Sequence, residues 1–161
     1  MHQTLQKFKD KRANGDDGFT LIELLVVVVI IGVLVAIAIP VYLSYTKGAQ
    51  NKSAQSDVRS AISTVENYYI TNSNQLPSTT GTTLTSGSGT PLDFPAKTGG
   101  TAQKAAVSDG NVLAFKNNDP TYVLCAQNTD GKEVYVYNSL NGGSVKKSTA
   151  ATVTACIAAG S

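Results

Sequence analysis

Hydrophobic and polar positions divide the chain into an apolar rod and a polar remainder. From Leu24 to Val41 no residue is charged or strongly polar, and this run of 18 residues is about what a helix needs to cross a hydrocarbon core. From Lys47 onward the sequence is rich in Ser, Thr, Asn and Gly. The pattern therefore predicts one membrane-length helix followed by one polar head.

Beyond Pro40, apolar residues recur at the spacing of one helix face, with charged residues between them. This stripe predicts that the helix continues in amphipathic form and packs on an apolar surface. The apolar positions are Ala54, Val58, Ala61, Ile62, Val65 and Tyr69, and the charged positions between them are Asp57, Arg59 and Glu66.

The C-terminal part of the chain has the composition of strands separated by turns. Turn residues stand at 128–131 (Asn-Thr-Asp-Gly) and at 141–143 (Asn-Gly-Gly), which is hairpin chemistry. We therefore expect an antiparallel meander packed on the amphipathic helix. The segments with strand-like content are 111–116, 121–127, 133–138 and 152–157.

Composition and charge add little chemistry to this picture. The 161 residues carry a formal net charge of +2, and without residues 1–18 nine basic side chains face eight acidic ones. No basic patch typical of nucleic-acid binding is visible. Direct binding of nucleic acid is thus unsupported and would have to use a local cluster such as Lys146 and Lys147, with high sensitivity to salt.

Cys125 and Cys156 are the two cysteines, and an even pair in a head that follows a membrane segment suggests a disulfide in an oxidising compartment. Such a bond would close a loop of about thirty residues and contribute about 3 to 4 kcal/mol by the loop-entropy estimate. We expect no catalytic site, because His2 is the single histidine and no histidine remains further along the chain to activate a thiol or hydroxyl. Asp109 and Asp130 each precede a glycine and indicate turns rather than calcium ligands, so we expect no metal and no cofactor.

Glu23 stands just inside the apolar run, where a carboxylate is costly and usually marks function. Glu23 lacks an obvious partner within its own chain. A plain single-pass anchor does not explain it. A secretory signal peptide is the other alternative, with a small-x-small exit at 36–38 (Ala-Ile-Ala); cleavage there would release a binding domain that starts at Ile39.

The residues Gly18 to Leu25 read GFTLIELL, and an unbroken apolar helix and then Pro40 follow them. This pattern resembles the N-terminal signature of the type IV pilin and pseudopilin family. The resemblance implies that prepilin peptidase cuts after Gly18 and methylates the new N-terminal amine of Phe19. It also implies that Glu23 of an incoming subunit forms an assembly salt bridge with the Phe19 amine of its neighbour.

The same resemblance bears on two weak points of the rod. Gly32 costs about 1 kcal/mol in a helix interior, and Pro40 removes a backbone donor and clashes with the preceding turn. In assembled pili of this family the helix often melts between such positions. A fixed kink in an intact helix is the alternative.

The family's fold sets our expectation for the whole chain: an α+β, pilin-like architecture whose hydrophobic half-helix protrudes, with a disulfide in the C-terminal region. We expect a cleaved leader at 1–18, a transmembrane and assembly helix at 19–40, and its amphipathic continuation at 41–75. A Ser/Thr/Gly-rich connecting loop should occupy 76–110, and a β-sheet head 111–161.

The function implied is that of a structural subunit, processed by prepilin peptidase and polymerised into type IV pili that serve motility, adhesion or DNA uptake. Its expected partners are further copies of itself, the peptidase and methyltransferase, and the inner-membrane assembly platform with its ATPases. The precursor should span the cell membrane once with its head outside, as basic residues before the run favour, and then enter an extracellular filament. Alternatives are a minor pilin or pseudopilin of a type II secretion system, and the secreted binding domain.

Overall fold

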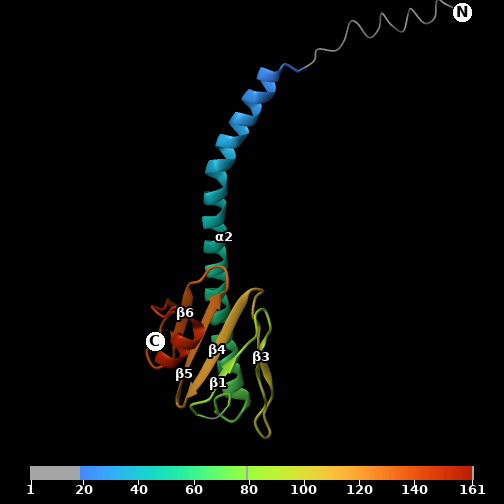
Figure 1. Cartoon of the computed structure of the whole chain (residues 1–161). Coiled ribbons are helices and arrows are strands. Elements are labelled where there is room, and N and C mark those ends of the chain that lie inside the picture. Colours follow the sequence, from blue (N-terminus) through green and yellow to red (C-terminus); the bar gives the residue numbers. More distant parts are fainter. Residues whose placement is uncertain (1–18, 79, 161) are drawn as a thin grey trace, which may run out of the picture. The chain divides into compact units, whose positions relative to one another are not determined.

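The computed structural model describes residues 19–78 and 80–160, so the expected leader at 1–18, which ends with Gly18, lies outside the described residues. The chain divides into two units, one up to Tyr42 and one from Leu43 onward. Each unit contains part of helix α2, which runs from Leu21 to Thr71 (Figure 1). The helix ends at Thr71 rather than at the expected residue 75. Just beyond this end, Ser73 and Asn74 take up positive φ angles, and the Asn74 amide donates a hydrogen bond to the Tyr69 carbonyl at 2.9 Å.

In the first unit, α2 is continuous through both expected weak points. Gly32 and Pro40 lie inside it, although proline removes one intrahelical hydrogen bond. Among the described residues, α2 is the one helix long and apolar enough to cross a membrane, judged by length and composition. No side chain from Leu21 to Tyr42 is buried within the chain.

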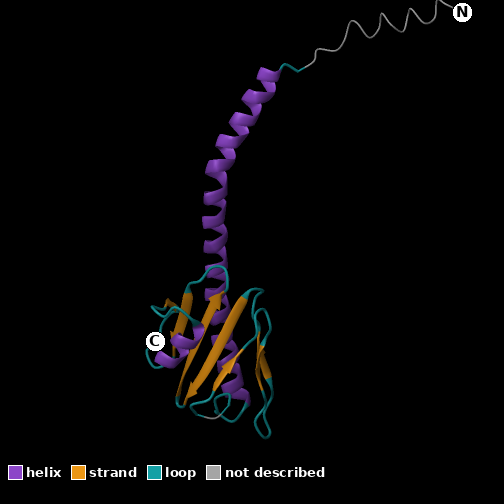
Figure 2. Cartoon of the chain, viewed as in Figure 1, coloured by secondary structure: helices purple, strands orange, loops and turns teal. Residues whose placement is uncertain are grey.

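The second unit is built on an antiparallel sheet in the order β1-β4-β5-β6-β7 (Figure 2). The expected central strands at 111–116, 121–127 and 133–138 are confirmed, and the expected turns at 128–131 and 141–143 lie between paired strands. The strands are β1 (Thr83–Thr85), β4 (Asn111–Asn118), β5 (Thr121–Asn128), β6 (Val134–Asn138) and β7 (Lys146–Lys147). The segment expected as a connecting loop contains β1 and also a separate two-stranded sheet of β2 (Leu92–Phe94) and β3 (Gln103–Ala105).

One face of the sheet packs against the second-unit part of α2, because alternate residues of each strand point to it. Phe115 lies opposite Leu124, and Leu113 lies opposite Ala126. These residues form one buried cluster with the stripe on α2. The buried residues of the helix are Ala54, Asp57, Val58, Ala61, Val65 and Tyr68.

The structure corrects the predicted stripe at two positions. Tyr68 is fully buried whereas Tyr69 is 37% exposed, because the stripe alternates steps of four and three residues and the step from Val65 is three. Asp57, expected on the polar face, is buried.

The opposite face of the sheet is covered by helix α3 (Val153–Ala159) (Figure 2). The prediction of a strand at 152–157 is therefore wrong. Thr152 caps the helix by accepting a hydrogen bond from the Ala155 amide, and Gly160 ends it in the left-handed conformation. These two caps outweigh the β-branched residues that gave the segment its strand-like content.

Candidate functional site

The start of α2 gathers the residues that the sequence singles out for assembly. Thr20 directly precedes the first helical residue, and Glu23 lies in the first turn. The Thr20 amide and the Thr20 hydroxyl both donate to Glu23 Oε2 at 2.9 Å. The Glu23 amide donates in return to Thr20 Oγ1 at 3.3 Å. This is a capping box, in which a threonine and a glutamate three residues later satisfy free amides of the first turn.

The expectation that Glu23 lacks a partner in its own chain is therefore wrong, since Thr20 is that partner. The spacing Thr-x-x-Glu ahead of an apolar run was present in the sequence and is a known helix-start signal. The capping box uses one carboxylate oxygen, because Oε2 accepts both hydrogen bonds from Thr20. Among the described residues, nothing donates a hydrogen bond to Glu23 Oε1.

The free side of Glu23 lies in an apolar setting. A shallow hollow beside it is lined by Phe19, Ile22, Val26 and Val27. The Phe19 side chain is 84% exposed, and the helix residues around it are exposed as well. Once lipid or protein covers this surface, the carboxylate loses water and needs a cation to offset its desolvation.

Of the other residues predicted in the N-terminal part of the chain, one lies outside the described residues and two lie within α2. Gly18, the expected cleavage position, lies outside the described residues. At Gly32 an added Cβ would meet nothing within 4 Å, so packing in the single chain does not require a glycine there. Pro40 lies in the same unbroken helix. The expected melting between Gly32 and Pro40 concerns the assembled filament, whereas the structure is that of a single chain.

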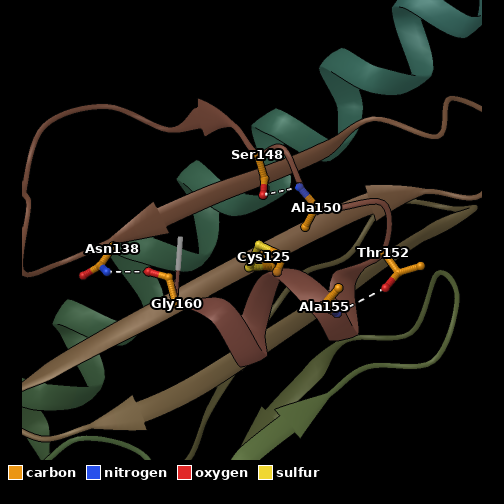
Figure 3. Close-up of a disulfide and its surroundings, with 8 residues drawn as sticks. Cys125, Asn138, Ser148, Ala150, Thr152, Ala155 and Gly160 are labelled. Carbon is orange, nitrogen blue, oxygen red and sulfur yellow. Dashed lines mark hydrogen bonds between the residues drawn. A yellow bond between two sulfur atoms is a disulfide. The ribbon is translucent and has the colours of Figure 1, made fainter.

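The predicted disulfide between Cys125 and Cys156 is confirmed. It joins β5 to α3, and both cysteines are fully buried (Figure 3). Asn138 of β6 holds the end of the helix by donating to the Gly160 carbonyl at 2.6 Å. The disulfide and this hydrogen bond fix α3 on the outer face of the sheet.

Sequence reasoning missed Asp57, which fastens α2 to the sheet unit. Its carboxylate accepts hydrogen bonds from the Ser108 amide at 2.8 Å, the Ser108 hydroxyl at 2.8 Å and Asn111 Nδ2 at 2.6 Å. Asn128 in turn donates to Asn111 Oδ1 at 2.7 Å. The available signal was positional, because Asp57 stands three residues after Ala54 and directly before Val58 on the apolar face.

The described residues contain no group of three or more His, Cys, Asp or Glu side chains that could hold a metal ion. At the start of α2 the chain presents one exposed carboxylate on an uncovered apolar helix. Such an arrangement suits association with a lipid phase or with other apolar helices.

Comparison with known proteins points to the same end of the chain. A family model described as the prokaryotic N-terminal methylation motif matches residues 14–39. A type IV major pilin protein, PilE1, of Neisseria gonorrhoeae is 31% identical over 129 residues, which cover 80% of this chain and 66% of the relative. No solved structure matches.

Two further relatives match shorter stretches of the chain. A fimbrial protein of Neisseria meningitidis serogroup B is 45% identical over 53 residues, covering 33% of this chain and 31% of the relative. A fimbrial protein of Pseudomonas aeruginosa is 61% identical over 41 residues, covering 26% and 27%. The chain thus spans about two thirds of the length of the first relative and about a third or less of the other two.

Proposed function

Because the chain belongs to the type IV pilin family, we propose that it is a structural subunit that polymerises through its N-terminal helix into a type IV pilus filament. The observation that carries this proposal is the first half of α2, which exposes a membrane-length apolar surface interrupted only by the Glu23 carboxylate. Lipid covers that surface in the precursor, and neighbouring subunits cover it in the filament.

We assign processing to the bond between Gly18 and Phe19, with residues 1–18 as the leader. Prepilin peptidase would cut this bond and methylate the new amine of Phe19. The match of the N-terminal methylation motif to residues 14–39 supports this assignment. The same match counts against a secreted domain that starts at Ile39, because that cleavage would discard both Phe19 and Glu23.

In the assembly step, Glu23 of one subunit pairs with the Phe19 ammonium of its neighbour. Each group alone is costly in an apolar environment, and pairing offsets that cost. Oε1 supports this role, because it is the carboxylate oxygen that Thr20 leaves unoccupied. Thr20 therefore holds the carboxylate in one orientation and leaves one oxygen for the incoming amine.

The remaining parts of the proposal follow from family membership. The precursor spans the membrane once with its head outside and is handed to the assembly platform and its ATPases. The head, with its sheet and disulfide, faces solvent in the filament and has a structural rather than an enzymatic role. The similarity to major pilins and fimbrial proteins favours a major subunit over a minor pilin or a pseudopilin of type II secretion.

Two substitutions at Glu23 test the assembly step. Glu23→Leu removes both the charge and the capping, whereas Glu23→Gln removes the charge and keeps a side chain that suits a capping box. We expect both variants to be processed and anchored in the membrane but not recovered in filaments sheared from cells. Glu66→Gln is the matched control, since Glu66 lies on the same helix and accepts a hydrogen bond from the Tyr122 hydroxyl at 2.7 Å.

Normal filament yield from Glu23→Leu would overturn the assembly role of Glu23. Normal yield from Glu23→Gln alone would show that capping, not charge, is what assembly needs. The intact mass and N-terminal residue of sheared material test processing independently. A methylated chain that starts at Phe19 is expected, and a chain that starts at Ile39 would contradict the whole proposal.

A further inference from the structure

The connection between β6 and β7, residues 139–145, contains an asparagine that is directly followed by a glycine. Asn141 is exposed, and within the described part of the chain its side-chain amide has no hydrogen-bond partner. After the expected leader, Asn141 is the one asparagine that a glycine follows. Its side chain is therefore free to turn toward the next peptide bond.

The backbone of this turn is fixed up to Asn141 and free beyond it. Asn138 Oδ1 accepts a hydrogen bond from the Leu140 amide at 2.9 Å, and the Asn138 carbonyl accepts one from the Asn141 amide at 3.2 Å. Asn138 is itself held, because it donates to the Gly160 carbonyl at 2.6 Å (Figure 3). The Gly142 amide, by contrast, donates to no described residue.

This arrangement suits attack of a backbone nitrogen on a side-chain amide. Once a base removes its proton, the Gly142 nitrogen can bond to Asn141 Cγ and close a five-membered ring. Glycine has no Cβ to obstruct the approach and adopts backbone angles that other residues avoid; Gly142 has a φ of 58°. Lys146 lines the same hollow as Asn141 and Gly142, so its positive charge stabilises the negative charge that develops during the attack.

Other candidate positions in the described part of the chain lack one of these conditions. Asn111 and Asn128 are buried, and Asn128 Nδ2 donates to Asn111 Oδ1 at 2.7 Å. A valine and a threonine follow them, whose Cβ atoms obstruct the approach. Asp130 does precede a glycine, but the Gly131 amide donates to Asn128 Oδ1 at 3.1 Å. A free side-chain amide and an unoccupied glycine amide thus coincide at Asn141.

We propose that Asn141 is a site of spontaneous deamidation through a succinimide formed with Gly142. The Gly142 nitrogen forms a bond to Asn141 Cγ, the bond from Cγ to Nδ2 breaks, and the leaving nitrogen takes up a proton and departs as ammonia. Water then opens the ring at one of its two carbonyls, which leaves aspartate or isoaspartate at position 141. Water is the only co-reactant, and no enzyme is needed.

Deamidation changes the charge of the hollow beside β7. The new carboxylate stands among the residues that include Lys146 and Lys147. Without residues 1–18, nine basic side chains face eight acidic ones, so one event makes the two numbers equal. Isoaspartate also lengthens the main chain, and the connection can absorb this because none of its residues belongs to a strand.

The reaction goes beyond the proposed function and does not depend on it, because it occurs within one chain. The detergent-solubilised mature chain is incubated in warm neutral buffer and then digested with trypsin, which releases the peptide 133–146 after Lys132. Mass spectrometry follows a gain of about 1 Da in this peptide, and fragmentation locates the gain and distinguishes isoaspartate from aspartate. Digestion in water enriched in heavy oxygen marks any deamidation that occurs during preparation.

Two alanine variants separate the attacking atom from the shape of the turn. Gly142→Ala should slow the gain at position 141 about tenfold, which corresponds to about 1.4 kcal/mol in the barrier. Gly143→Ala is the matched control, because Gly143 also has a positive φ, of 82°. An added Cβ meets nothing within 4 Å at either glycine, and Gly143→Ala leaves the attacking nitrogen unchanged. It should react at the rate of the parent chain.

Several results would overturn the proposal. They are the absence of a mass gain at position 141, a gain without isoaspartate, which would indicate direct hydrolysis without a ring, and equal slowing by the two alanine variants. A synthetic peptide of residues 133–146 gives the rate without the fold. We expect the folded chain to react within about tenfold of the peptide, and a rate more than about 100-fold lower would show that the turn protects Asn141.

Discussion

The two parts of helix α2 differ in where their partners lie. From Leu21 to Tyr42 no side chain is buried, whereas the part from Leu43 to Thr71 buries one face against the sheet. Helical structure is the same in both parts, so the backbone does not distinguish them. The difference lies in packing: the second part finds its apolar partner within the chain, and the first part requires lipid or another chain.

Each part also carries one carboxylate in apolar surroundings, and the two are satisfied to different degrees. Asp57 is 7% exposed and accepts three hydrogen bonds from Ser108 and Asn111. Glu23 is exposed, and within the part of the chain that the structure describes its donors come from Thr20 alone. The three donors identify Asp57 as a structural carboxylate, whereas the uncovered oxygen of Glu23 is consistent with the intersubunit pairing that we propose for it.

The largest effect on the stability of the second unit should come from its disulfide. Replacing both Cys125 and Cys156 by Ala should lower the free energy of unfolding of the second unit by about 3 to 4 kcal/mol, because the bond closes a loop with a sequence separation of 31. Urea unfolding of the detergent-solubilised mature chain, followed by tyrosine circular dichroism in the near ultraviolet, measures this. Processing at Phe19 should not change. A loss below about 1 kcal/mol would mean that Asn138 and the apolar contacts suffice to hold α3.

A matched pair of valines tests the comparison directly. Val58 is fully buried and Val28 is 61% exposed, and both lie in α2. Val58→Ala should destabilise the second unit by about 1.5 to 3 kcal/mol through lost burial and a cavity. Val28→Ala should leave unfolding of that unit unchanged and instead lower the yield of sheared filaments. Equal effects of the two substitutions on unfolding would contradict the division of the helix.

The sequence predicted the elements that depend on local pattern and missed those that depend on tertiary contacts. The central strands followed from β-branched and aromatic runs bounded by turn residues. The stripe on α2 followed from helical spacing, except at its end, where a shift of one position exchanged Tyr69 for Tyr68. The capping box of Thr20 and Glu23 follows from the spacing Thr-x-x-Glu, but the expectation for Glu23 considered only the cost of a carboxylate in lipid.

Two features were beyond pattern reasoning for physical reasons. The segment at 152–157 contains β-branched residues that also occur in short helices, and its helix is held on the sheet by the disulfide to Cys125 and the hydrogen bond from Asn138, neither of which a local pattern shows. The burial of Asp57 depends on donors from Ser108 and Asn111, which lie more than fifty residues away. Helical spacing places Asp57 on the apolar face of α2, but no local signal identifies these partners.

The smallest effect concerns two glycines with equally open surroundings, Gly32 in the first part of α2 and Gly48 in the second. An added Cβ meets nothing within 4 Å at either position, so each change to alanine should favour helix by about 1 kcal/mol. Gly48→Ala should raise the unfolding free energy of the second unit, because that part of the helix is folded against the sheet.

Gly32→Ala should leave that unfolding free energy unchanged and act in the filament. If the helix melts between Gly32 and Pro40 on assembly, alanine at position 32 opposes the melting, and a map of variant filaments should show longer continuous helical density than a map of the parent. Continuous density through Gly32 and Pro40 in the parent filament would remove the melting proposal. The first part of α2 would then keep one conformation in lipid and in the filament, and the two parts would differ only in what covers them.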